Sequence, residues 1–302
     1  MNIDRSIIIN GWLNVFKEQG YTSSHIVRTL KKKFNIKKIG HYGTLDPLAA
    51  GVLPLALGEA TKTIQFITCN QKSYSFFINW GKETDTCDNA GKVINETNVR
   101  PNFSKIKTTI KKYFMGNIDQ TPPIFSAVKV NGKRAYQLAR NNEKFEIKSK
   151  RINIINFELL KSVNKNKAQF LVSCGPGTYV RSLARDLSKK LGTLGYASSI
   201  VRLKNSYFCI SRSISFDKII KSNVSNFYNK LLPVDYVLKN FEEIKLEKKY
   251  SDLLKDGKIV FLSEFNNNEE RDSIFLIKCN SELVSIANLK KGYIIPRRNF
   301  NN

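Results

Sequence analysis

The chain has few of the side chains that build metal centres. It contains two histidines, and none of its five cysteines lies within four residues of another, so the CxxC pairs of zinc sites are missing. An odd and scattered set of thiols is typical of a reduced, cytosolic protein. We therefore expect neither a metal centre nor a disulfide framework.

Long apolar runs, a secretory signal and phosphate-binding loops are missing as well. No apolar run reaches the roughly 18 residues of a membrane helix. The N-terminal stretch Met1–Arg5 lacks the charged-then-apolar pattern of a signal peptide. No Gly-rich loop follows a predicted strand, which excludes dinucleotide-binding oxidoreductases and kinases. The expectation is a cytoplasmic protein without membrane contact.

Acidic residues are scarce relative to basic ones. The 302 residues include 25 Asp and Glu against 50 Lys and Arg, which gives a net charge of +25. This balance indicates a polyanionic partner such as nucleic acid. A drift of composition toward Lys, Asn and Ile would also raise the charge, but it does not explain clustering. Six basic residues and no acid lie between Glu18 and Asp46, and four more follow Glu282; such stretches attract phosphates.

The periodicity of apolar residues predicts a mixture of helices and strands. The predicted helices cover residues 22–34, 103–114 and 180–191, and the predicted strands cover residues 74–80 and 170–174. The apolar run 52–57 fits either a buried strand or a short helix. Because the elements show no regular βαβ rhythm, we predict the α+β class.

A domain boundary is predicted near residues 235–243. Short β-like runs follow at residues 259–262, 273–277 and 283–288, separated by turns rich in Asn, Glu and Asp. We therefore expect a larger domain, residues 1–236, and a small β-rich domain, residues 242–302.

One carboxylate stands out by its surroundings. Asp46 lies in a loop marked by Gly and Pro, inside the stretch KIGHYGTLDPLAAGVL at residues 38–53. A carboxylate can act as a covalent nucleophile. To do so it must be ionised yet shielded from water, so a cation should lie close by. The alternative is that Asp46 merely caps the turn before Pro47.

The stretch at residues 38–53 resembles the catalytic signature of pseudouridine synthases of the TruB type. The resemblance implies an enzyme that isomerises a uridine in the T loop of tRNA, position 55, with Asp46 as nucleophile and without metal, redox cofactor or nucleotide energy. It also implies a pseudouridine-synthase fold, in which helices flank a central, mostly antiparallel mixed sheet. The C-terminal segment is similar to the small, PUA-like RNA-binding domain of bacterial members.

A second run supplies the candidate cation. The segment CGPGTYVRSLARDL at residues 174–187 is similar to the family's Gly-Thr-Tyr-(Ile/Val)-Arg run, whose Arg pairs with the catalytic carboxylate. This assigns the role to Arg181, since a guanidinium stays charged and binds a carboxylate in a plane. An exposed helix Arg paired with Asp186 is the alternative. Tyr179 resembles a family residue that packs against the target nucleotide.

Three further positions match the family on the RNA side of the cleft. Tyr74 follows Lys72 as in the family's Lys-x-Tyr strand, and an aromatic ring there can stack on the flipped uracil or help to remove the C5 proton. His41 can stack on a splayed base, and Lys62 can hold a phosphate. A core tyrosine, a structural histidine and a solvated lysine are the alternatives.

The remaining matches concern RNA binding and support of the site. The expected substrate-binding residues are Lys17, Lys129, Ile200 and Arg202 together with those above. Glu18 replaces the proline that usually follows the family's Lys, and Val201 replaces the first of two adjacent arginines. The basic segment at residues 121–151 is expected to close over the T arm. The Thr-Asp-Thr-x-Asp loop at residues 84–88 resembles a family loop that supports the active site.

The sequence thus predicts a tRNA pseudouridine synthase that needs no obligatory protein partner and acts as a monomer. Attack at C1′ and attack at C6 both remain open. A tRNA-binding or folding module without catalysis is one alternative. An RNA-guided pseudouridine synthase of the archaeal and eukaryotic type is another, although the extended basic tails expected for it are absent.

Overall fold

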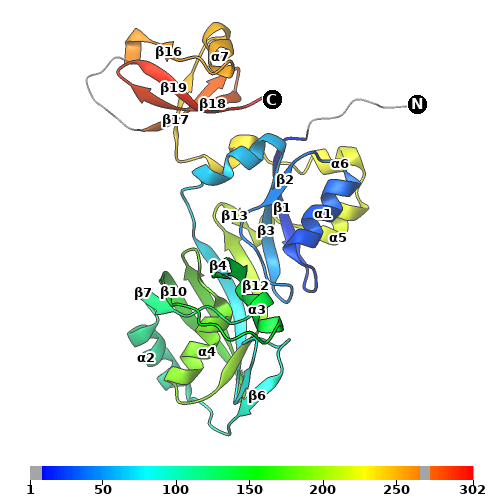
Figure 1. The fold of residues 1–302 in the computed structure, drawn as a ribbon, viewed down its shortest axis with the longest axis vertical. Helices are drawn as coiled ribbons and strands as arrows, with labels where there is room; N and C mark the ends of the chain where they lie inside the picture. The colour runs from blue at the N-terminus through cyan, green and yellow to red at the C-terminus, as the bar shows by residue number, and fades with distance from the viewer. Residues whose placement is uncertain (1–8, 266–272, 302) are drawn as a thin grey trace.

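The computed structural model describes residues 9–265 and 273–301, so the Met1–Arg5 stretch lies outside the described residues. The described residues form a large ten-stranded sheet, a small five-stranded sheet and two two-stranded sheets, β5 (Lys82–Thr84) with β6 (Val93–Glu96) and β8 (Lys129–Val130) with β9 (Lys133–Arg134). The five-stranded sheet lies at the top of Figure 1. The large sheet comprises β1 (Gly11–Lys17), β2 (Ile39–His41), β3 (Ala50–Leu57), β4 (Lys72–Trp80), β7 (Gly116–Gln120), β10 (Lys150–Asn164), β11 (Lys167–Cys174), β12 (Gly195–Asn205), β13 (Phe208–Cys209) and β14 (Ile214–Ser215).

The large sheet is mixed but mostly antiparallel. Its order is β14-β1-β3-β12-β4-β11-β10-β7, with β2 paired to β3 and β13 paired to β12. The β1–β14 and β3–β12 pairs are parallel. Gly51 allows the β3–β12 pair, because it has φ +110° and a Cβ there would lie 2.3 Å from the carbonyl oxygen of Arg202. The apolar run 52–57 is therefore a strand in the middle of the sheet.

Three helices cover the sheet where the periodicity predicted them: α1 (Ser23–Lys33), α2 (Phe103–Tyr113) and α4 (Val180–Lys190). Thr22 caps α1 by accepting a hydrogen bond from the His25 amide at 3.0 Å, and Asn102 caps α2 in the same way. Strands β4 and β11 confirm the alternation at residues 74–80 and 170–174. No described helix is long and apolar enough to cross a membrane.

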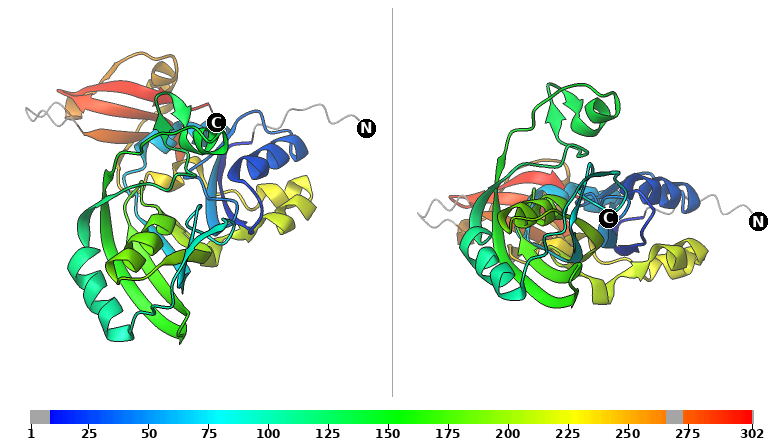
Figure 2. Two further views of the ribbon diagram at one scale, coloured as in Figure 1. Left: turned by 60° about the horizontal axis from the view of Figure 1, so that its bottom comes forward. Right: turned by 90° about the horizontal axis from the view of Figure 1, so that it is seen from below.

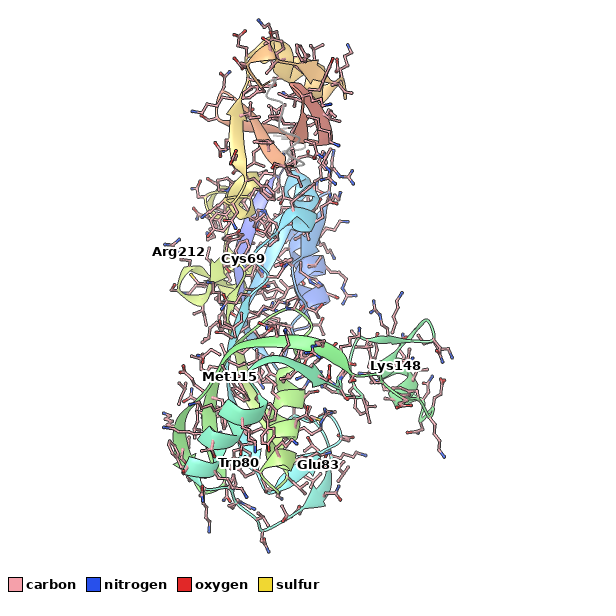
Figure 3. The ribbon with its side chains drawn as sticks, turned by 90° about the vertical axis from the view of Figure 1, so that its left-hand side faces the viewer. Cys69, Trp80, Glu83, Met115, Lys148 and Arg212 are labelled. Atoms are coloured by element: carbon pink, nitrogen blue, oxygen red, sulfur yellow. The ribbon has the colours of Figure 1, made fainter. Side chains whose placement is uncertain are left out.

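Smaller elements complete the larger part of the chain. They are β5 (Lys82–Thr84), β6 (Val93–Glu96), η1 (Gly58–Lys62), η2 (Ile64–Phe66), η3 (Ile210–Arg212), α5 (Phe216–Lys221), α6 (Val224–Tyr228) and η4 (Val234–Val237). The expected basic segment follows β7 and contains β8 (Lys129–Val130), β9 (Lys133–Arg134) and α3 (Ala135–Arg140). The green ribbon in the right-hand view of Figure 2 shows this segment projecting from the body, and Lys148 marks it in Figure 3.

Among its described residues, the C-terminal β domain has five strands, one α-helix and the 3-10 helix η5 (Ser263–Phe265). The strands β15 (Glu242–Lys245), β16 (Val260–Phe261), β17 (Ile274–Cys279), β18 (Glu282–Lys290) and β19 (Tyr293–Asn299) form a sheet of order β15-β17-β18-β19-β16. Helix α7 (Lys248–Lys255) packs against it. The β-like runs predicted β16, β17 and β18, whereas β15, α7 and β19 were not predicted.

The C-terminal domain is docked by a shared hydrophobic cluster. Phe300, fully buried, packs in one cluster with Trp12 and Val52 of the large sheet. The Lys62 ammonium donates a hydrogen bond to the Asn299 carbonyl at 2.8 Å and lies over the Phe300 ring. The junction is therefore built like a protein core, which favours a fixed arrangement.

Candidate active site

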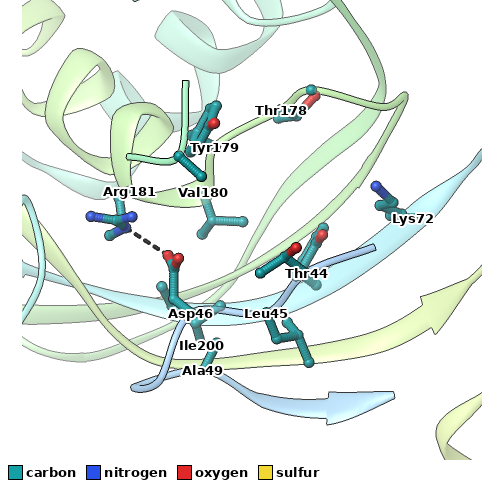
Figure 4. Close-up of a pocket in the computed structure, with 13 residues that line it drawn as sticks. Thr44, Leu45, Asp46, Ala49, Lys72, Thr178, Tyr179, Val180, Arg181 and Ile200 are labelled. Carbon is teal, nitrogen blue, oxygen red and sulfur yellow. Dashed lines mark ion pairs between the residues drawn. The ribbon is translucent and has the colours of Figure 1, made fainter. Parts of the chain in front are cut away.

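A cavity of about 230 Å³ opens at the centre of the large sheet. It lies between the β2–β3 loop, strands β4 and β12, the first turn of α4 and the segment after β7 (Figure 4). Its walls are formed by Thr44, Leu45, Asp46, Ala49, Lys72, Tyr74, Ala127, Gly177, Thr178, Tyr179, Val180, Arg181 and Ile200. Five of the ten residues predicted to act in catalysis or substrate binding thus meet in one place.

Asp46 and Arg181 form an ion pair inside this cavity. The Arg181 Nε lies 2.8 Å from the Asp46 Oδ2, as the dashed line in Figure 4 shows. The Asp46 side chain is 42% exposed, whereas the Arg181 side chain is only 6% exposed. The carboxylate is therefore open to a ligand while its countercharge stays shielded, an arrangement in which a carboxylate can act as a nucleophile.

Arg181 is itself held by the backbone of two other segments. Its Nη1 donates to the Thr86 carbonyl at 3.0 Å, and its Nη2 donates to the Phe125 carbonyl at 3.2 Å. The buried Asp88 places its Oδ2 3.6 Å from the Nε of Arg181. Residues 84–88 thus support the site through the guanidinium. Arg181 is not the exposed, Asp186-paired helix residue of the alternative reading, because Arg185 makes that pair.

The loop that carries Asp46 is fixed on both sides. The Ser23 hydroxyl donates to the Leu45 carbonyl at 3.1 Å and accepts from the Leu45 amide at 3.0 Å. The Lys17 Nζ donates to the carbonyls of Glu18, Tyr21 and Pro47. These bonds remove the freedom of the backbone around the carboxylate, so its position is set before substrate arrives.

Arg202 closes the same loop from β12. Its Nε donates to the Val52 carbonyl at 2.7 Å, and its Nη1 and Nη2 donate to the carbonyls of Thr44 and Gly43 at 3.3 and 2.8 Å. No carboxylate pairs with it among the described residues. Its charge is satisfied by backbone dipoles, which is how a buried cation is tolerated without a salt bridge.

This arrangement corrects two expectations. Lys17 and Arg202 were expected to bind substrate, but both side chains are fully buried and neither lines the cavity. A phosphate could not reach them without opening the loop. The structure makes them positioning residues for the Asp46 loop.

Tyr74 lies in the cavity wall on β4, which β12 separates from β3, the strand that follows the Asp46 loop. Burial raises the pKa of Tyr74 above its ordinary value of 10, and the neighbouring Arg202 guanidinium opposes that rise. The phenol is therefore protonated at neutral pH. A neutral ring with a hydroxyl held beside a cation can stack on a base and can also exchange a proton.

Tyr179 and Ile200 owe their places to two local features. The Gln120 side chain accepts from the Tyr179 amide at 2.8 Å and donates to its carbonyl at 3.1 Å, which holds the start of α4. In β12 a register shift between Ser198 and Val201 contains Ser199 at φ +47°. Such a bulge redirects a side chain, and here Ile200 lines the cavity.

The other three predicted residues lie outside the cavity wall. His41 is half-buried in β2, where burial and then the charge of Arg202 lower its pKa. Lys62 pairs with Glu59 at 2.6 Å and contacts the C-terminal domain, so its ammonium is already engaged. Lys129 is exposed in the β8–β9 hairpin. Of these three residues, Lys129 is the exposed one, so its side chain can reach a large ligand.

Sequence reasoning did not assign a role to Lys72. This lysine precedes Tyr74 by two positions on β4, so both side chains point to the same face of the sheet. That alternation was a signal present in the sequence. The small residues Thr44, Ala127 and Thr178 also line the cavity, and no chemical property distinguished them in advance.

Comparison with known proteins gives a consistent assignment of relatives. A model of the TruB family pseudouridylate synthase N-terminal domain matches residues 31–180. The tRNA pseudouridine synthase B of Ehrlichia ruminantium (strain Gardel) is 38% identical over 296 residues, which cover 96% of this chain and 99% of that protein. The tRNA pseudouridine synthase B of Rhodospirillum rubrum is 37% identical over 301 residues, which cover 97% of each chain.

Solved structures share the architecture. A chain in the structure of an H/ACA RNP bound to a substrate RNA containing 2′-deoxyuridine superposes with a TM-score of 0.72. The match covers 98% of this chain and 86% of that chain at 20% identity. Identity at this level relates the folds alone.

Proposed function

The chain belongs to the TruB family of pseudouridylate synthases, and on that premise we propose that it converts the uridine at position 55, in the T loop of tRNA, to pseudouridine. Its fold is the one expected, a mixed sheet flanked by helices and followed by a PUA-like β domain. One observation carries the proposal: an ion-paired yet accessible carboxylate, Asp46, lies in a cavity beside an aromatic ring, Tyr74.

The isomerisation moves one bond and one proton. The N1–C1′ bond breaks, the base turns, C5 bonds to C1′, the C5 proton leaves and N1 gains a proton. Asp46 acts as nucleophile at C1′ or C6 and is released at the end, and the Arg181 guanidinium, 2.8 Å away, orients it. Tyr74 stacks on the extruded uracil, and its hydroxyl lies where it can take part in removal of the C5 proton. Atoms and charges balance within these groups.

RNA docking is assigned to the basic segments around the cavity. The larger domain, residues 1–236, carries the chemistry, and its segment 121–151, with the exposed Lys129, closes over the T arm. The C-terminal domain, residues 242–302, contacts the RNA beyond the T arm. Flipping the uridine costs about a few kcal/mol, which phosphate contacts must offset. The protein is proposed to act as a monomer in the cytoplasm.

The test is an assay of pseudouridine formation on a T-arm stem-loop RNA by purified protein. Asp46→Asn is expected to abolish turnover while it keeps RNA affinity, because the amide is isosteric but not nucleophilic. Asp119→Asn, an exposed Asp on β7, is the matched control and should keep full activity. Turnover by Asp46→Asn would reject the mechanism. Tight binding by the wild type without pseudouridine at position 55 would instead favour a non-catalytic tRNA-binding module.

A further inference from the structure

The cavity wall contains two cationic side chains, Arg181 and Lys72, and they differ in their hydrogen-bond and ion-pair partners. Arg181 is engaged by Asp46 and by two backbone carbonyls. The Lys72 side chain has no hydrogen-bond or ion-pair partner in the part of the chain that the structure describes. Figure 4 shows the two at opposite sides of the cavity, with Thr44 between Asp46 and Lys72. Lys72 is thus the cation whose donors remain available to a ligand.

The loop before Asp46 makes room for this lysine. Gly43 has φ +80°, and a Cβ there would lie 3.6 Å from the Cε of Lys72 and 3.4 Å from the Nη1 of Arg202. The lysine stem therefore lies across the loop backbone, next to the fully buried Arg202. Burial and then the charge of Arg202 lower the pKa of Lys72. A half-buried ammonium beside another cation gains more from an anion than an exposed lysine does.

The chemistry of the substrate limits which anion this can be. A uridine extruded from an RNA loop brings a neutral base and its flanking phosphates. The carboxylate of Asp46 already pairs with Arg181, so Lys72 is not needed as its counterion. An ammonium on a flexible stem binds phosphate as a point charge and fixes the register of the nucleotide without reading the base.

We propose that Lys72 binds a phosphate adjacent to the extruded uridine and so sets the position of the ribose relative to Asp46. This inference rests on the proposed function, since it needs an RNA nucleotide in the cavity. Lys72 contacts substrate and does not take part in bond making. The phosphate holds one end of the nucleotide, and stacking on Tyr74 holds the other.

The experiment measures binding, so that it does not depend on turnover. In an Asp46→Asn background, Lys72→Met should weaken binding of a T-arm stem-loop about tenfold, the size of a charge-assisted hydrogen bond. The slope of log affinity against log salt should fall by about 0.7 to 1, as for one lost phosphate contact. Lys161→Met, an exposed lysine on β10 outside the cavity, is the matched control and should change neither quantity.

Two modified RNAs locate the contact. Each carries one neutral methylphosphonate, on the 5′ or the 3′ side of the target uridine. With one of them the affinity difference that Lys72→Met causes in the Asp46→Asn background should vanish, because the anion is gone. A tenfold difference that persists on both RNAs would overturn the proposal, as would an unchanged salt slope. Failure of the proposed function would be seen separately, as absence of pseudouridine with unmodified RNA and wild-type protein.

Discussion

Lys17 and Arg202 hold opposite ends of the loop that carries Asp46. The Lys17 Nζ donates to the Pro47 carbonyl at 3.3 Å, and the Arg202 Nη2 donates to the Gly43 carbonyl at 2.8 Å. Both cations are fully buried and donate their hydrogen bonds to backbone carbonyl oxygens. Two buried charges, each of which costs desolvation free energy, thus fix one short loop. This cost is understandable if the function requires a fixed position of the Asp46 carboxylate.

The first prediction concerns Arg202. Arg202→Met should lower the free energy of unfolding by about 2–4 kcal/mol, because the carbonyls of Gly43, Thr44 and Val52 lose their donor. Denaturant titration measures this. Arg28→Met, an exposed arginine of α1, should change it by less than about 0.5 kcal/mol. A variant as stable as the wild type would mean that relief of the buried charge outweighs the lost hydrogen bonds.

The second prediction concerns pH and Lys17. Burial lowers the pKa of Lys17 to about 8, with Asp46 opposing and Arg202 adding to the shift. The unfolded chain binds this proton up to about pH 10.5, so below pH 8 the folded state bears the full cost of the buried charge. That cost, about 3 kcal/mol, should be relieved as pH rises from 8 to 10.5.

The measurement compares unfolding free energies of the wild type and Lys17→Met across this window. The wild type should gain stability relative to the variant as pH rises. A difference that stays flat between pH 8 and 10.5 would show that Lys17 titrates near its ordinary pKa.

The third prediction concerns the guanidinium beside Asp46. Arg181→Lys keeps the charge but cannot contact Asp46 and the carbonyls of Thr86 and Phe125 at once. Single-turnover rates should fall about 100-fold, with RNA affinity changed less than about twofold. Arg100→Lys is the matched control, since Arg100 also holds a backbone carbonyl but lies outside the cavity. Equal losses in both variants would argue against a specific role of Arg181.

The fourth prediction concerns the docking of the C-terminal domain. Phe300→Ala should cost about 3–5 kcal/mol, as for an aromatic ring removed from a core, and should split unfolding into two transitions. Phe261 is 48% exposed, so Phe261→Ala should cost less than about 1 kcal/mol. Calorimetry distinguishes the two outcomes. A single transition in Phe300→Ala would show that other contacts suffice to dock the domain.

Sequence reasoning succeeded where the signal is local. Helices α1, α2 and α4 and strands β4 and β11 follow from apolar periodicity and from capping residues such as Thr22. The pairing of Asp46 with Arg181 was predicted from two contiguous sequence runs that resemble the same family. Neither periodicity nor charge could have paired residues so far apart in the chain.

The misplaced residues share a physical cause. A charged side chain is ordinarily exposed, so Lys17 and Arg202 were expected to face RNA, whereas backbone carbonyls from a distant loop satisfy them. The bulge at Ser199 breaks the two-residue period of β12, which concealed that strand. Helix α7 buries only Ser251 and Leu254, too few positions to give a periodic pattern.

The docking through Phe300 has one more consequence. Because the five-stranded sheet shares a hydrophobic cluster with Trp12 and Val52, packing sets how far it stands from the cavity. An RNA that touches both places must offer two contact points at one separation. The protein would then select a folded tRNA by the distance between these two contact points before the uridine is flipped. A short hairpin that reaches only the cavity would not be subject to this selection.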